Sequence, residues 1–299
     1  MKALCIGDLA LDVVALLRTE ITYGSDTQAH ISTHGGGTGG NVATWLGSKK
    51  VPVFLVTRVG KDTAGDALIR ELDAFGVEHN AEAIEGIHTG VVISLVDSNG
   101  ERTMFPDSGA NAGLSLKDLP PLTGISVAYI SGYSFLNPTS RPGVIEMAKE
   151  INKHSIPIIF DPASIGSMNF RGKEGLDEIL KLTDVMILNR SEAEFLSGAT
   201  SAESALTALL KKVPCVVIKT GADGAIAQTR ITHTEGGDVV SIPAHPADVK
   251  DTTGAGDAFA AGFIASWMKS RDLSTALTNA TQYAAECVAI IGARPHVAP

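Results

Sequence analysis

The sequence DTTGAGD, residues 251–257, runs directly into the apolar stretch AFAAGFI at 258–264. The small residues between the threonines and the final aspartate are Gly254, Ala255 and Gly256. The apolar stretch predicts a buried helix over 257–269. Glycines before a helix expose successive backbone N–H groups, which form an anion-binding nest at the positive end of the helix. The segment therefore predicts a loop that binds an anion at the start of a buried helix.

The Asp257 carboxyl in this first turn has two interpretations. Acids are common in the first turn of a helix, where they cap N–H groups and complement the helix dipole. Alternatively, the nest holds negative charge that develops on a phosphoryl group, while Asp257 takes a proton from an attacking hydroxyl. Two threonines and a second acid, Asp251, lie in the same short segment. This concentration of polar groups favours the second interpretation.

Short apolar runs alternate with segments of helical period along the chain. Strands are expected at 3–6, 53–57, 126–131, 156–160, 184–188 and 214–218. Helices are expected at 41–49, 63–75, 139–153, 201–211, 257–269 and 273–290. This alternation predicts an α/β fold, in which a mainly parallel central sheet is flanked by helices. Functional loops are then expected at the carboxyl ends of the strands.

Two segments interrupt the alternation and predict a small β-sheet. Residues 89–106 indicate a hairpin that turns at Asn99-Gly100, a pair suited to a type I′ turn. The polar segment 12–34 has no helical period. We expect a single domain over residues 1–299, with a lid formed by insertions at about 12–34 and 88–107. Exposed lid edges would pair with a second copy of the chain, which predicts a homodimer.

Composition excludes several classes of protein. The net charge of −9 argues against a general nucleic-acid binder, which would show a basic face. The three cysteines lie far apart without zinc-like spacing, so they are expected to be reduced thiols in the core. Asp8 and Asp12 interrupt the apolar start of the chain, which does not match a signal peptide. No stretch reaches the length of a membrane span. We expect a cytoplasmic protein with no membrane partner.

A second glycine-rich segment, GGGTGGN, occupies residues 35–41. It fits the dinucleotide pattern GxGxxG, but no convincing strand precedes it and no acidic residue follows about 20 positions on. The chain also has no phosphate loop of the GxxxxGK[ST] type. Two interpretations remain: a glycine-rich turn before a helix, or bare backbone that approaches a polar ligand. In the second, Asn41 would offer that ligand both a donor and an acceptor.

Taken together, these motifs resemble those of the ribokinase-like (PfkB) family of carbohydrate kinases, in the same order over nearly the whole chain. The matching segments are GGGTGGNVA (35–43), RVGKDTAG (58–65), NRSEAE (189–194), KTGADGA (219–225), DTTGAGDAFAAGF (251–263) and GARP (292–295). The first looks like the family's sugar-site signature, and the last resembles a tail segment that closes the nucleotide site. The resemblance implies a three-layer ribokinase-like fold with a small β-sheet lid. It also implies MgATP-dependent phosphorylation of a sugar or nucleoside hydroxyl.

The resemblance further implies roles for the matching residues. The catalytic base would be Asp257, with an anion hole formed by Gly254, Ala255 and Gly256. Substrate hydroxyls would be held by Asp12, Gly36, Gly37 and Asn41. ATP would be flanked by Asn189, Lys219, Thr220, Gly221 and Gly224. Magnesium and its waters would lie near Asn189 and Glu192. A monovalent cation such as potassium would lie near Asp251, Thr253, Ala289 and Gly292.

The proposed metal residues also have a structural interpretation. Asn189 and Glu192 offer oxygen ligands, which suit a hard cation that keeps several waters. The same segment could instead begin a helix, since Ser191 and Glu194 resemble a capping box.

Asp12 and Lys219 likewise have two interpretations. Asp12 lies on an otherwise apolar strand, where it could begin a turn or accept two vicinal hydroxyls. Lys219 could contact ATP or could be the solvated end of a strand.

Two departures from the family pattern bear on the substrate. Thr38 stands where members that use sugar phosphates carry a lysine, which favours an unphosphorylated substrate. The segment FDPASIG (160–166) lacks the Asn and Arg that follow DP in many sugar-specific members, which keeps a nucleoside substrate open.

We therefore expect a kinase for a small unphosphorylated sugar, ribose- or fructose-like. The alternative is a nucleoside kinase, adenosine- or pseudouridine-like. The intact Asp257 and its nest argue against a non-catalytic binding protein. The poor context of the glycine fingerprint argues against a dehydrogenase.

Overall fold

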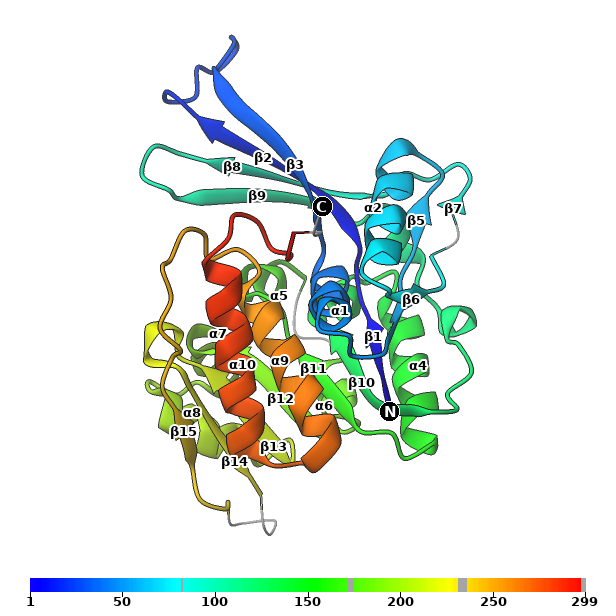
Figure 1. Ribbon diagram of the computed structural model, residues 1–299, viewed down its shortest axis with the longest axis vertical. Coiled ribbons are helices and arrows are strands. Elements are labelled where there is room, and N and C mark those ends of the chain that lie inside the picture. The colour runs from blue at the N-terminus through cyan, green and yellow to red at the C-terminus, as the bar shows by residue number, and fades with distance from the viewer. Residues whose placement is uncertain (82, 172–174, 231–235, 297–299) are drawn as a thin grey trace.

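The central element of the protein is a mixed β-sheet. The computed structural model describes residues 1–81, 83–171, 175–230 and 236–296. Within them, the largest sheet has the strand order β15-β14-β13-β12-β11-β10-β1-β4-β6 (Figure 1). Its strands are β1 (Lys2–Ile6), β4 (Val53–Val56), β6 (Glu78–His79), β10 (Ile125–Ser131), β11 (Ile158–Asp161), β12 (Val185–Asn189), β13 (Cys215–Lys219), β14 (Ala225–Thr229) and β15 (Val240–Ile242). Neighbours from β13 to β6 are parallel, and β14 and β15 extend one edge in antiparallel fashion. All six predicted strands are confirmed, with small shifts at their ends.

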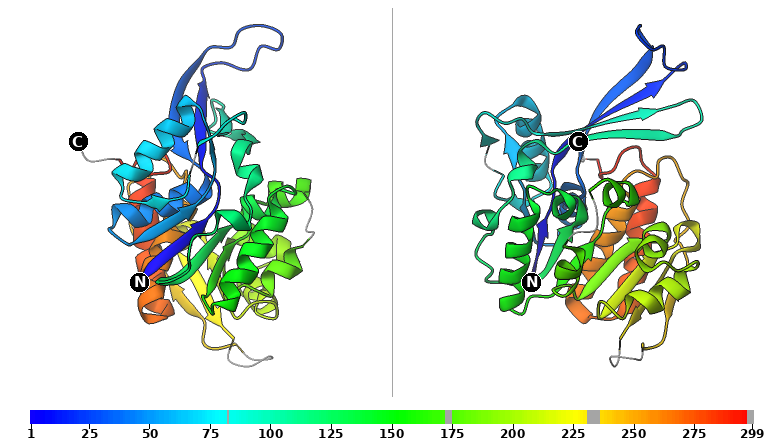
Figure 2. Two further views of the ribbon diagram at one scale, coloured as in Figure 1. Left: turned by 90° about the vertical axis from the view of Figure 1, so that its right-hand side faces the viewer. Right: turned by 180° about the vertical axis from the view of Figure 1, so that it is seen from behind.

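Helices cover both faces of this sheet, which gives the predicted three layers (Figures 1 and 2). The α-helices are α1 (Thr38–Ser48), α2 (Thr63–Ala74), α3 (Gly132–Leu136), α4 (Arg141–Lys153), α5 (Ile165–Arg171), α6 (Leu176–Leu180), α7 (Arg190–Ser197), α8 (Ala202–Leu209), α9 (Ala255–Ser270) and α10 (Leu273–Val288). Short 3₁₀ helices are η1 (Gly109–Gly113), η2 (Leu116–Asp118) and η3 (Gly221–Asp223). The helices α1, α2, α9 and α10 pack on one face, and α3 to α8 pack on the other.

The parallel strands appear in the sequence as apolar runs because both of their faces are buried. In β1, Ala3 and Cys5 join the core under α1 and α9, whereas Leu4 and Ile6 join the core on the opposite face. All four side chains are fully buried. A strand that is covered on both sides has no solvent-facing positions, and its sequence therefore does not alternate between apolar and polar residues.

A smaller sheet, with the order β3-β2-β8-β9, projects beyond the carboxyl ends of the central strands (Figures 1 and 2). It is built from β2 (Ala10–Leu17), β3 (Ala29–Gly36), β8 (Gly90–Val96) and β9 (Arg102–Asp107). The short strands β5 (Val59–Gly60) and β7 (Ala83–Ile84) pair separately. The two segments without helical period thus form one sheet.

The predicted hairpin is present, but the predicted turn type is wrong. A type I′ turn needs positive φ at both central residues. Gly100 has a φ of 83°, whereas Asn99 does not have a positive φ. The Asp97 carboxyl instead accepts hydrogen bonds from the backbone N–H groups of Asn99 and Glu101, at 2.8 and 2.9 Å. This side chain organises a longer loop over 97–101.

The GGGTGGN segment is also preceded by a strand, contrary to the sequence analysis. Strand β3 ends at Gly36, inside the segment, and α1 begins at Thr38. The strand was missed because its sequence, AHISTHGG, has no apolar run, and only its last residue is buried. It pairs antiparallel with β2 in the small sheet, so it is not the parallel strand that a dinucleotide fingerprint requires.

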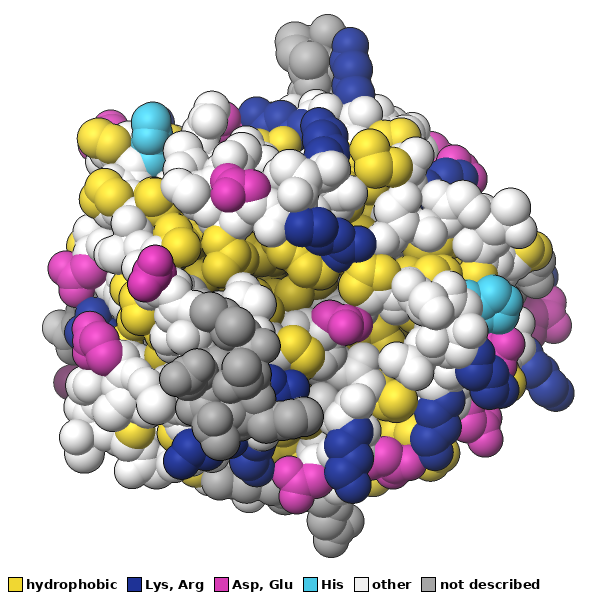
Figure 3. Space-filling view, turned by 90° about the horizontal axis from the view of Figure 1, so that it is seen from below, with side chains coloured by type: hydrophobic (Ala, Val, Ile, Leu, Met, Phe, Trp, Pro, Cys, Tyr) yellow, Lys and Arg dark blue, Asp and Glu magenta, His cyan; other side chains and the backbone are white. Residues whose placement is uncertain are grey.

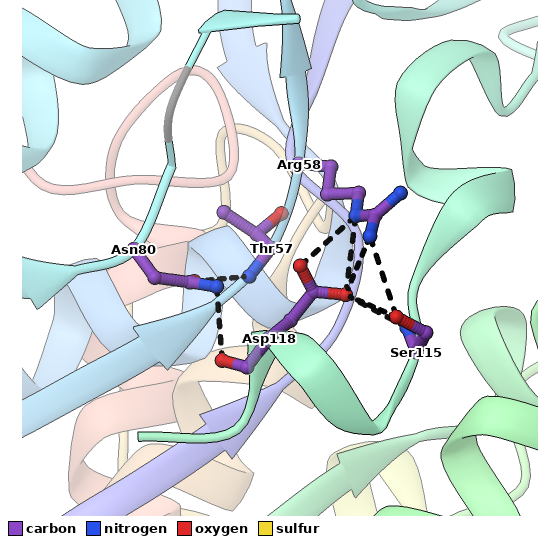
Figure 4. A network of polar contacts seen from close by, with 5 residues as sticks. All are labelled: Thr57, Arg58, Asn80, Ser115 and Asp118. Atoms are coloured by element: carbon purple, nitrogen blue, oxygen red, sulfur yellow. Dashed lines mark hydrogen bonds and ion pairs between the residues drawn. The ribbon is translucent and has the colours of Figure 1, made fainter.

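The segment RVGKDTAG anchors loops at the base of the small sheet. The Arg58 guanidinium forms an ion pair with Asp118, at 3.0 Å (Figure 4). Asn80 accepts from the backbone N–H of Thr57 and donates to the Asp118 carbonyl, which joins the end of β4 to η2 (Figure 4). A similar anchor follows, where Asp62 caps α2 and accepts hydrogen bonds from Thr89, just before β8.

The end of the molecule opposite the small sheet shows a central band of apolar side chains bordered by charged ones (Figure 3). In the part of the chain that the structure describes, no helix is both long and apolar enough to cross a membrane.

Candidate functional site

Polar side chains gather where the parallel strands end. Ser131, Asp161, Asn189 and Lys219 are the last residues of four neighbouring strands. The registers pair Ser131 with Asp161 and Asn189 with Lys219. Asp8 follows the end of β1 after a single glycine. Ligands of open α/β sheets bind at this edge, so the sheet topology itself collects these groups into one site.

The DTTGAGD loop reaches this edge and brings Asp257 next to Asn41. Gly254 caps α9 with a φ of 76°, in the left-handed region that favours glycine. Asp257 lies in the first turn of α9, and its Oδ2 accepts a 2.8 Å hydrogen bond from Asn41 Nδ2. Burial raises the pKa of Asp257 to about 7, although the Asn41 hydrogen bond acts in the opposite direction. The two glycine-rich motifs therefore converge on one carboxylate.

Asp12 lies directly over the glycine-rich segment. It is within β2, opposite His34, so the interpretation of Asp12 as the start of a turn is wrong. A Cβ built on Gly36 would lie 2.2 Å from the Asp12 carboxyl carbon, and one on Gly37 would lie 2.5 Å from the Asp8 carbonyl. Burial raises the pKa of Asp12 to about 6, despite the nearby positive charge of Arg294. Asp12, Gly36 and Gly37 thus pack together beside Asn41.

Asp8 is a site residue that the sequence analysis did not single out. Its carboxyl accepts from the Ser131 hydroxyl at 3.2 Å and from the Thr38 backbone N–H at 3.3 Å. Burial raises its pKa. The available signal was a carboxylate that follows a buried apolar run after a single glycine, because such a residue must lie at the carboxyl edge of the sheet.

Lys219 lies between acids rather than at a solvated strand end. Only 15% of its side chain is exposed, and its ammonium is 3.1 Å from the Asp161 carboxylate. A Cβ built on Gly256 would lie 3.3 Å from the same ammonium, so Lys219 borders the nest. Asp161 was another omission, although it too ends a buried strand. Together the ammonium and the nest offer positive charge and N–H donors to a phosphate.

The residues Thr220, Gly221 and Gly224 form the turn between β13 and β14. The turn is closed by a 2.8 Å hydrogen bond from Thr220 N to the Gly224 carbonyl. Gly221 and Gly224 have φ values of 68° and 99°, which require glycine-like freedom. An ion pair of 2.9 Å between Asp223 and Arg190 joins this turn to the start of α7.

The predicted magnesium residues form a capping box themselves. Asn189 Oδ1 accepts from Glu192 N at 2.9 Å, and Glu192 Oε2 accepts from Asn189 N at 2.8 Å. The box therefore uses this pair, not Ser191 and Glu194. Burial raises the pKa of Glu192 to about 7, although Lys219 opposes the effect. Within the described ranges no three His, Cys, Asp or Glu side chains cluster as a metal site.

Asp251, Thr253 and Gly292 come together, and an unforeseen arginine joins them. Asp251 accepts from Thr253 N at 2.9 Å and from Gly292 N at 3.0 Å. Arg102, at the start of β9, donates to Asp251 at 2.7 Å and also contacts the Thr253 hydroxyl. Burial opposes ionisation, but these hydrogen bonds hold the pKa of Asp251 well below its usual range. Ala289, next to this cluster in the chain, caps the end of α10.

Arg294, in the GARP segment, lies beside Asn41 and Gly36. The role of this segment in closing the nucleotide site, which the resemblance implies, stays a prediction. The Arg294 guanidinium donates to Asn41 Oδ1 at 2.8 Å and to the Gly36 carbonyl at 2.6 Å. Nothing in the local sequence indicated this position, because the contacts join residues about 250 positions apart.

Comparisons with known proteins identify the family to which the chain belongs. The sequence profile described as pfkB family carbohydrate kinase matches residues 1–298. The ATP-dependent ribose-1-phosphate kinase of Halopiger xanaduensis is 30% identical over 98% of this chain and 93% of its own. The ribokinase of Bacillus subtilis is 27% identical over 98% and 95% of the two chains. The solved structure of adenosine kinase from Sinorhizobium meliloti has the same fold, with a TM-score of 0.87, 22% identity and coverage of 98% and 95%.

The profile match extends over almost the whole chain, and the Halopiger relative aligns along nearly its full length. The predicted ribokinase-like fold is confirmed by the solved structures. The chain therefore belongs to the pfkB family of carbohydrate kinases and is an ATP-dependent carbohydrate kinase.

Proposed function

We propose that the enzyme transfers the γ-phosphoryl group of MgATP to a hydroxyl of a small unphosphorylated sugar, ribose- or fructose-like. The observation that carries this proposal is the hydrogen bond between Asn41 and Asp257, beside the Asp12 carboxylate over Gly36. Carboxylates accept hydrogen bonds from sugar hydroxyls, and the Asn41 amide carries both a donor and an acceptor. This group forms an acceptor side, opposite a nucleotide side that contains Lys219 and Glu192.

In the proposed reaction Asp257 is the general base. It takes the proton of the acceptor hydroxyl, whose oxygen forms a bond to the γ-phosphorus of ATP. The bond from this phosphorus to the bridging oxygen breaks, and ADP leaves with the electron pair. The N–H groups of Gly254, Ala255 and Gly256, with the Lys219 ammonium, stabilise the negative charge of the phosphoryl oxygens.

The residues on the nucleotide side fit a magnesium–phosphate group. Glu192 is 95% buried next to Lys219 and Asp161, so a carboxylate and an ammonium face the same space. Bound magnesium would neutralise charge on the phosphates and would keep most of its waters, as it does with one or two carboxylates. Asn189 and Glu192 would hold those waters, and the turn at Thr220, Gly221 and Gly224 would flank the nucleotide.

The charge of the acceptor side favours an uncharged sugar. Besides burial, the charge of Asp8 raises the pKa of both Asp12 and Asp257, so three carboxyl groups lie near one another there. Arg294, the cation whose charge acts on Asp12, already pairs with Glu71 at 2.7 Å. A phosphorylated acceptor would meet repulsion from these acids. The relative from Halopiger is named for a phosphorylated substrate, so this preference requires direct measurement.

A nucleoside acceptor is the second candidate. The segment after β11 carries Ala163 and Ser164, and Tyr133 lies close enough to Asp8 and Asp257 for their charges to raise its pKa. Burial is the main cause of that shift, to about 12. A half-buried aromatic ring beside two small residues gives a base a surface on which to stack.

A coupled ADP-release assay separates these possibilities. Ribose, fructose, adenosine, pseudouridine and ribose 1-phosphate are compared at equal concentration with MgATP. We expect the highest kcat/KM for one of the two free sugars. A preference for a nucleoside would support the second candidate, and a preference for ribose 1-phosphate would contradict the argument from charge.

We further propose that the small sheet is a lid over the site. Asp12 extends from β2 into the acceptor side, and Arg102 joins β9 to Asp251. Closure would exclude water from the phosphoryl group. We expect residues 90–107 to exchange amide hydrogens more slowly with sugar and a non-hydrolysable ATP analogue than without them. Unchanged exchange in this segment would count against closure.

The outer face of the lid is apolar, which supports the predicted homodimer. Ile93 and Phe105 face each other across β8 and β9, and they are 43% and 52% exposed. They lie on the opposite face from Asp12, because Asp12 pairs with Val92 and neighbours along a strand alternate. We expect a dimer by light scattering and a monomer for Phe105→Thr. Val239→Thr, which changes a 49% exposed residue outside the lid, should leave the dimer intact.

Potassium activation remains a prediction, and the contacts of Arg102 make that prediction more specific. The Asp251 carboxylate and the Thr253 hydroxyl fit a monovalent cation, but the Arg102 guanidinium contacts both. An ion would compete with Arg102 for the same oxygen. Because an exposed ion pair contributes roughly 0.5–1 kcal/mol, we expect about two- to fivefold stronger activation in Arg102→Met than in the wild type. Rates are compared in potassium and tetramethylammonium chloride at matched ionic strength. Equal rates in both salts for both proteins would rule activation out.

A further inference from the structure

The Arg294 side chain, from the C-terminal tail, lies buried under the GGGTGGN segment. Only 5% of it is exposed. Its Nε donates to Asn41 Oδ1 at 2.8 Å, and Nη2 donates to the Gly36 carbonyl at 2.6 Å. Its Nη1 donates to Glu71, on α2, at 2.7 Å. A guanidinium presents its donors in a rigid plane, so this single side chain fixes the relative position of three elements.

Two glycines of the segment supply the space for this guanidinium. A Cβ built on Gly40 would lie 2.4 Å from Arg294 Nη2, and one built on Gly35 would lie 2.3 Å from Nη1. Both distances are far below van der Waals contact, so a side chain at either position would displace the guanidinium. Gly35 and Gly40 therefore accommodate Arg294. The sequence analysis had assigned bare backbone here to ligand approach or to a turn.

Arg294 also decides which way the Asn41 amide faces. A guanidinium has donors but no acceptor, and so it selects the amide oxygen. The amide nitrogen then points to Asp257, to which it donates at 2.8 Å. In the reversed orientation, the amide nitrogen would face the guanidinium donors, and the amide oxygen would face the Asp257 carboxylate.

We infer that Arg294 is a positioning residue that acts through Asn41 to hold Asp257 ready for proton transfer, and this inference rests on the proposed role of Asp257 as the base. Two charge effects support it. Burial raises the pKa of Asp257, and the Asn41 hydrogen bond lowers it. Burial also raises the pKa of Asp12, and the charge of Arg294 lowers it. Loss of Arg294 should therefore leave both carboxylates more protonated at neutral pH.

The test uses two variants of the full-length enzyme. Arg294→Lys keeps the charge but loses the planar set of donors, and Arg294→Met combined with Glu71→Gln avoids leaving the Glu71 carboxylate without its partner. In both we expect the acid limb of the kcat/KM profile to move up by roughly one pH unit. At pH 7, kcat/KM for the acceptor should fall about tenfold, since a hydrogen bond in a charged network is lost. KM for ATP should change less than twofold, because Arg294 lies on the acceptor side.

Two further variants exclude a merely structural effect. Arg58→Met removes an arginine that pairs with Asp118 at 3.0 Å, away from the catalytic carboxylate (Figure 4). It should lower the melting temperature but leave the acid limb in place. In an Asn41→Leu background, Arg294→Lys should move the acid limb no further, because the two residues act in series. A folded Arg294→Lys enzyme with a wild-type acid limb and acceptor KM would overturn the inference.

A spectroscopic measurement keeps the inference testable if the Arg294 variants fail to fold. In the wild type, the Arg294 Nε–H signal in ¹⁵N NMR should shift with pH at the midpoint of the Asp257 titration. The shift should vanish in Asp257→Asn. A signal that does not titrate would contradict the coupling without any need for activity. The proposed function itself is tested by wild-type turnover and by the effect of Asp257→Asn, so failure of one can be told from failure of the other.

Discussion

Asp257→Asn is expected to lower kcat by about 10²–10⁴-fold, the usual contribution of a positioned proton acceptor. The amide has nearly the size of the carboxyl and caps a helix about as well. It cannot, however, take the proton of the acceptor hydroxyl. KM for the sugar should change less, because the other acceptor-side contacts are proposed to come from Asp12 and Asn41. The measurement is kcat and KM for sugar and ATP on the same purified variant.

The competing explanation is that Asp257 only stabilises the start of α9. It predicts nearly normal turnover and a loss of a few tenths of a kcal/mol, up to about 1 kcal/mol, from the helix dipole. A folded Asp257→Asn enzyme that keeps more than about a tenth of wild-type kcat would therefore refute the assignment, since that is well above the expected range. Asp66→Asn is a matched control, because Asp66 is likewise an acid in the first turn of its helix, α2, but is exposed and lies outside the proposed site.

The pH dependence gives the same test a second readout. Burial raises the pKa of Asp257 to about 7. A base must be ionised, so wild-type kcat/KM should fall by about tenfold per pH unit below this value. The residual activity of Asp257→Asn should lack this acid limb.

Stability should respond to pH in the opposite direction. A carboxyl whose pKa is raised on folding contributes stability at low pH, and this contribution is lost as pH rises through the folded value. Asp257→Asn should therefore be at least as thermostable as the wild type at pH 8. A lower melting temperature at pH 8 would indicate a structural role.

The positions of the parallel strands that end at the site could be predicted because buried strands appear in the sequence as apolar runs. Each parallel strand is covered on both faces, so runs such as ALCI and PCVVI stand out from their surroundings. The topology then places the ends of these strands at one edge. The same rule also predicts Asp161 and Asp8, which belong to none of the recognised motifs and were therefore missed.

The partners of each charge could not be predicted, because they depend on contacts across the whole fold. Lys219 pairs with Asp161 across 58 residues, and Arg294 bonds to Asn41 across 253 residues. Arg102 reaches Asp251 from the small sheet, 149 residues away. Local periodicity constrains only the element on which a side chain lies. The packing of β9 and of the C-terminal tail against the nest decides which charged side chains come into contact.

The type I′ turn predicted at Asn99-Gly100 is also absent because of a contact from outside the pair. The pair itself fits a two-residue turn, but the Asp97 carboxyl competes by accepting backbone N–H groups. A short acidic side chain thus replaces the backbone bonds of the tighter turn, and the loop becomes longer.

Gly254→Ala is expected to lower kcat by about 10²–10³-fold, the effect of losing one oxyanion donor. Gly254 has a φ of 76°, and a Cβ there would lie 2.6 Å from Ala293 Cα and 2.7 Å from the Ala293 carbonyl oxygen. Backbone atoms cannot yield as a flexible side chain can, so the loop must move. That movement should displace the N–H groups of the nest from the proposed phosphoryl position.

A second glycine separates this effect from the cost of a left-handed residue. Gly124 has a φ of 82°, and a Cβ built there would meet no atom within 4 Å. It precedes β10 at the edge of the sheet opposite the site. Gly124→Ala should therefore cost the same roughly 1–2 kcal/mol of backbone strain but leave kcat unchanged. If Gly254→Ala loses no more activity than Gly124→Ala, the nest does not stabilise the transferred group. If only Gly254→Ala loses kcat while the two variants lose similar stability, the loss of activity comes from the changed orientation of the N–H groups in the nest.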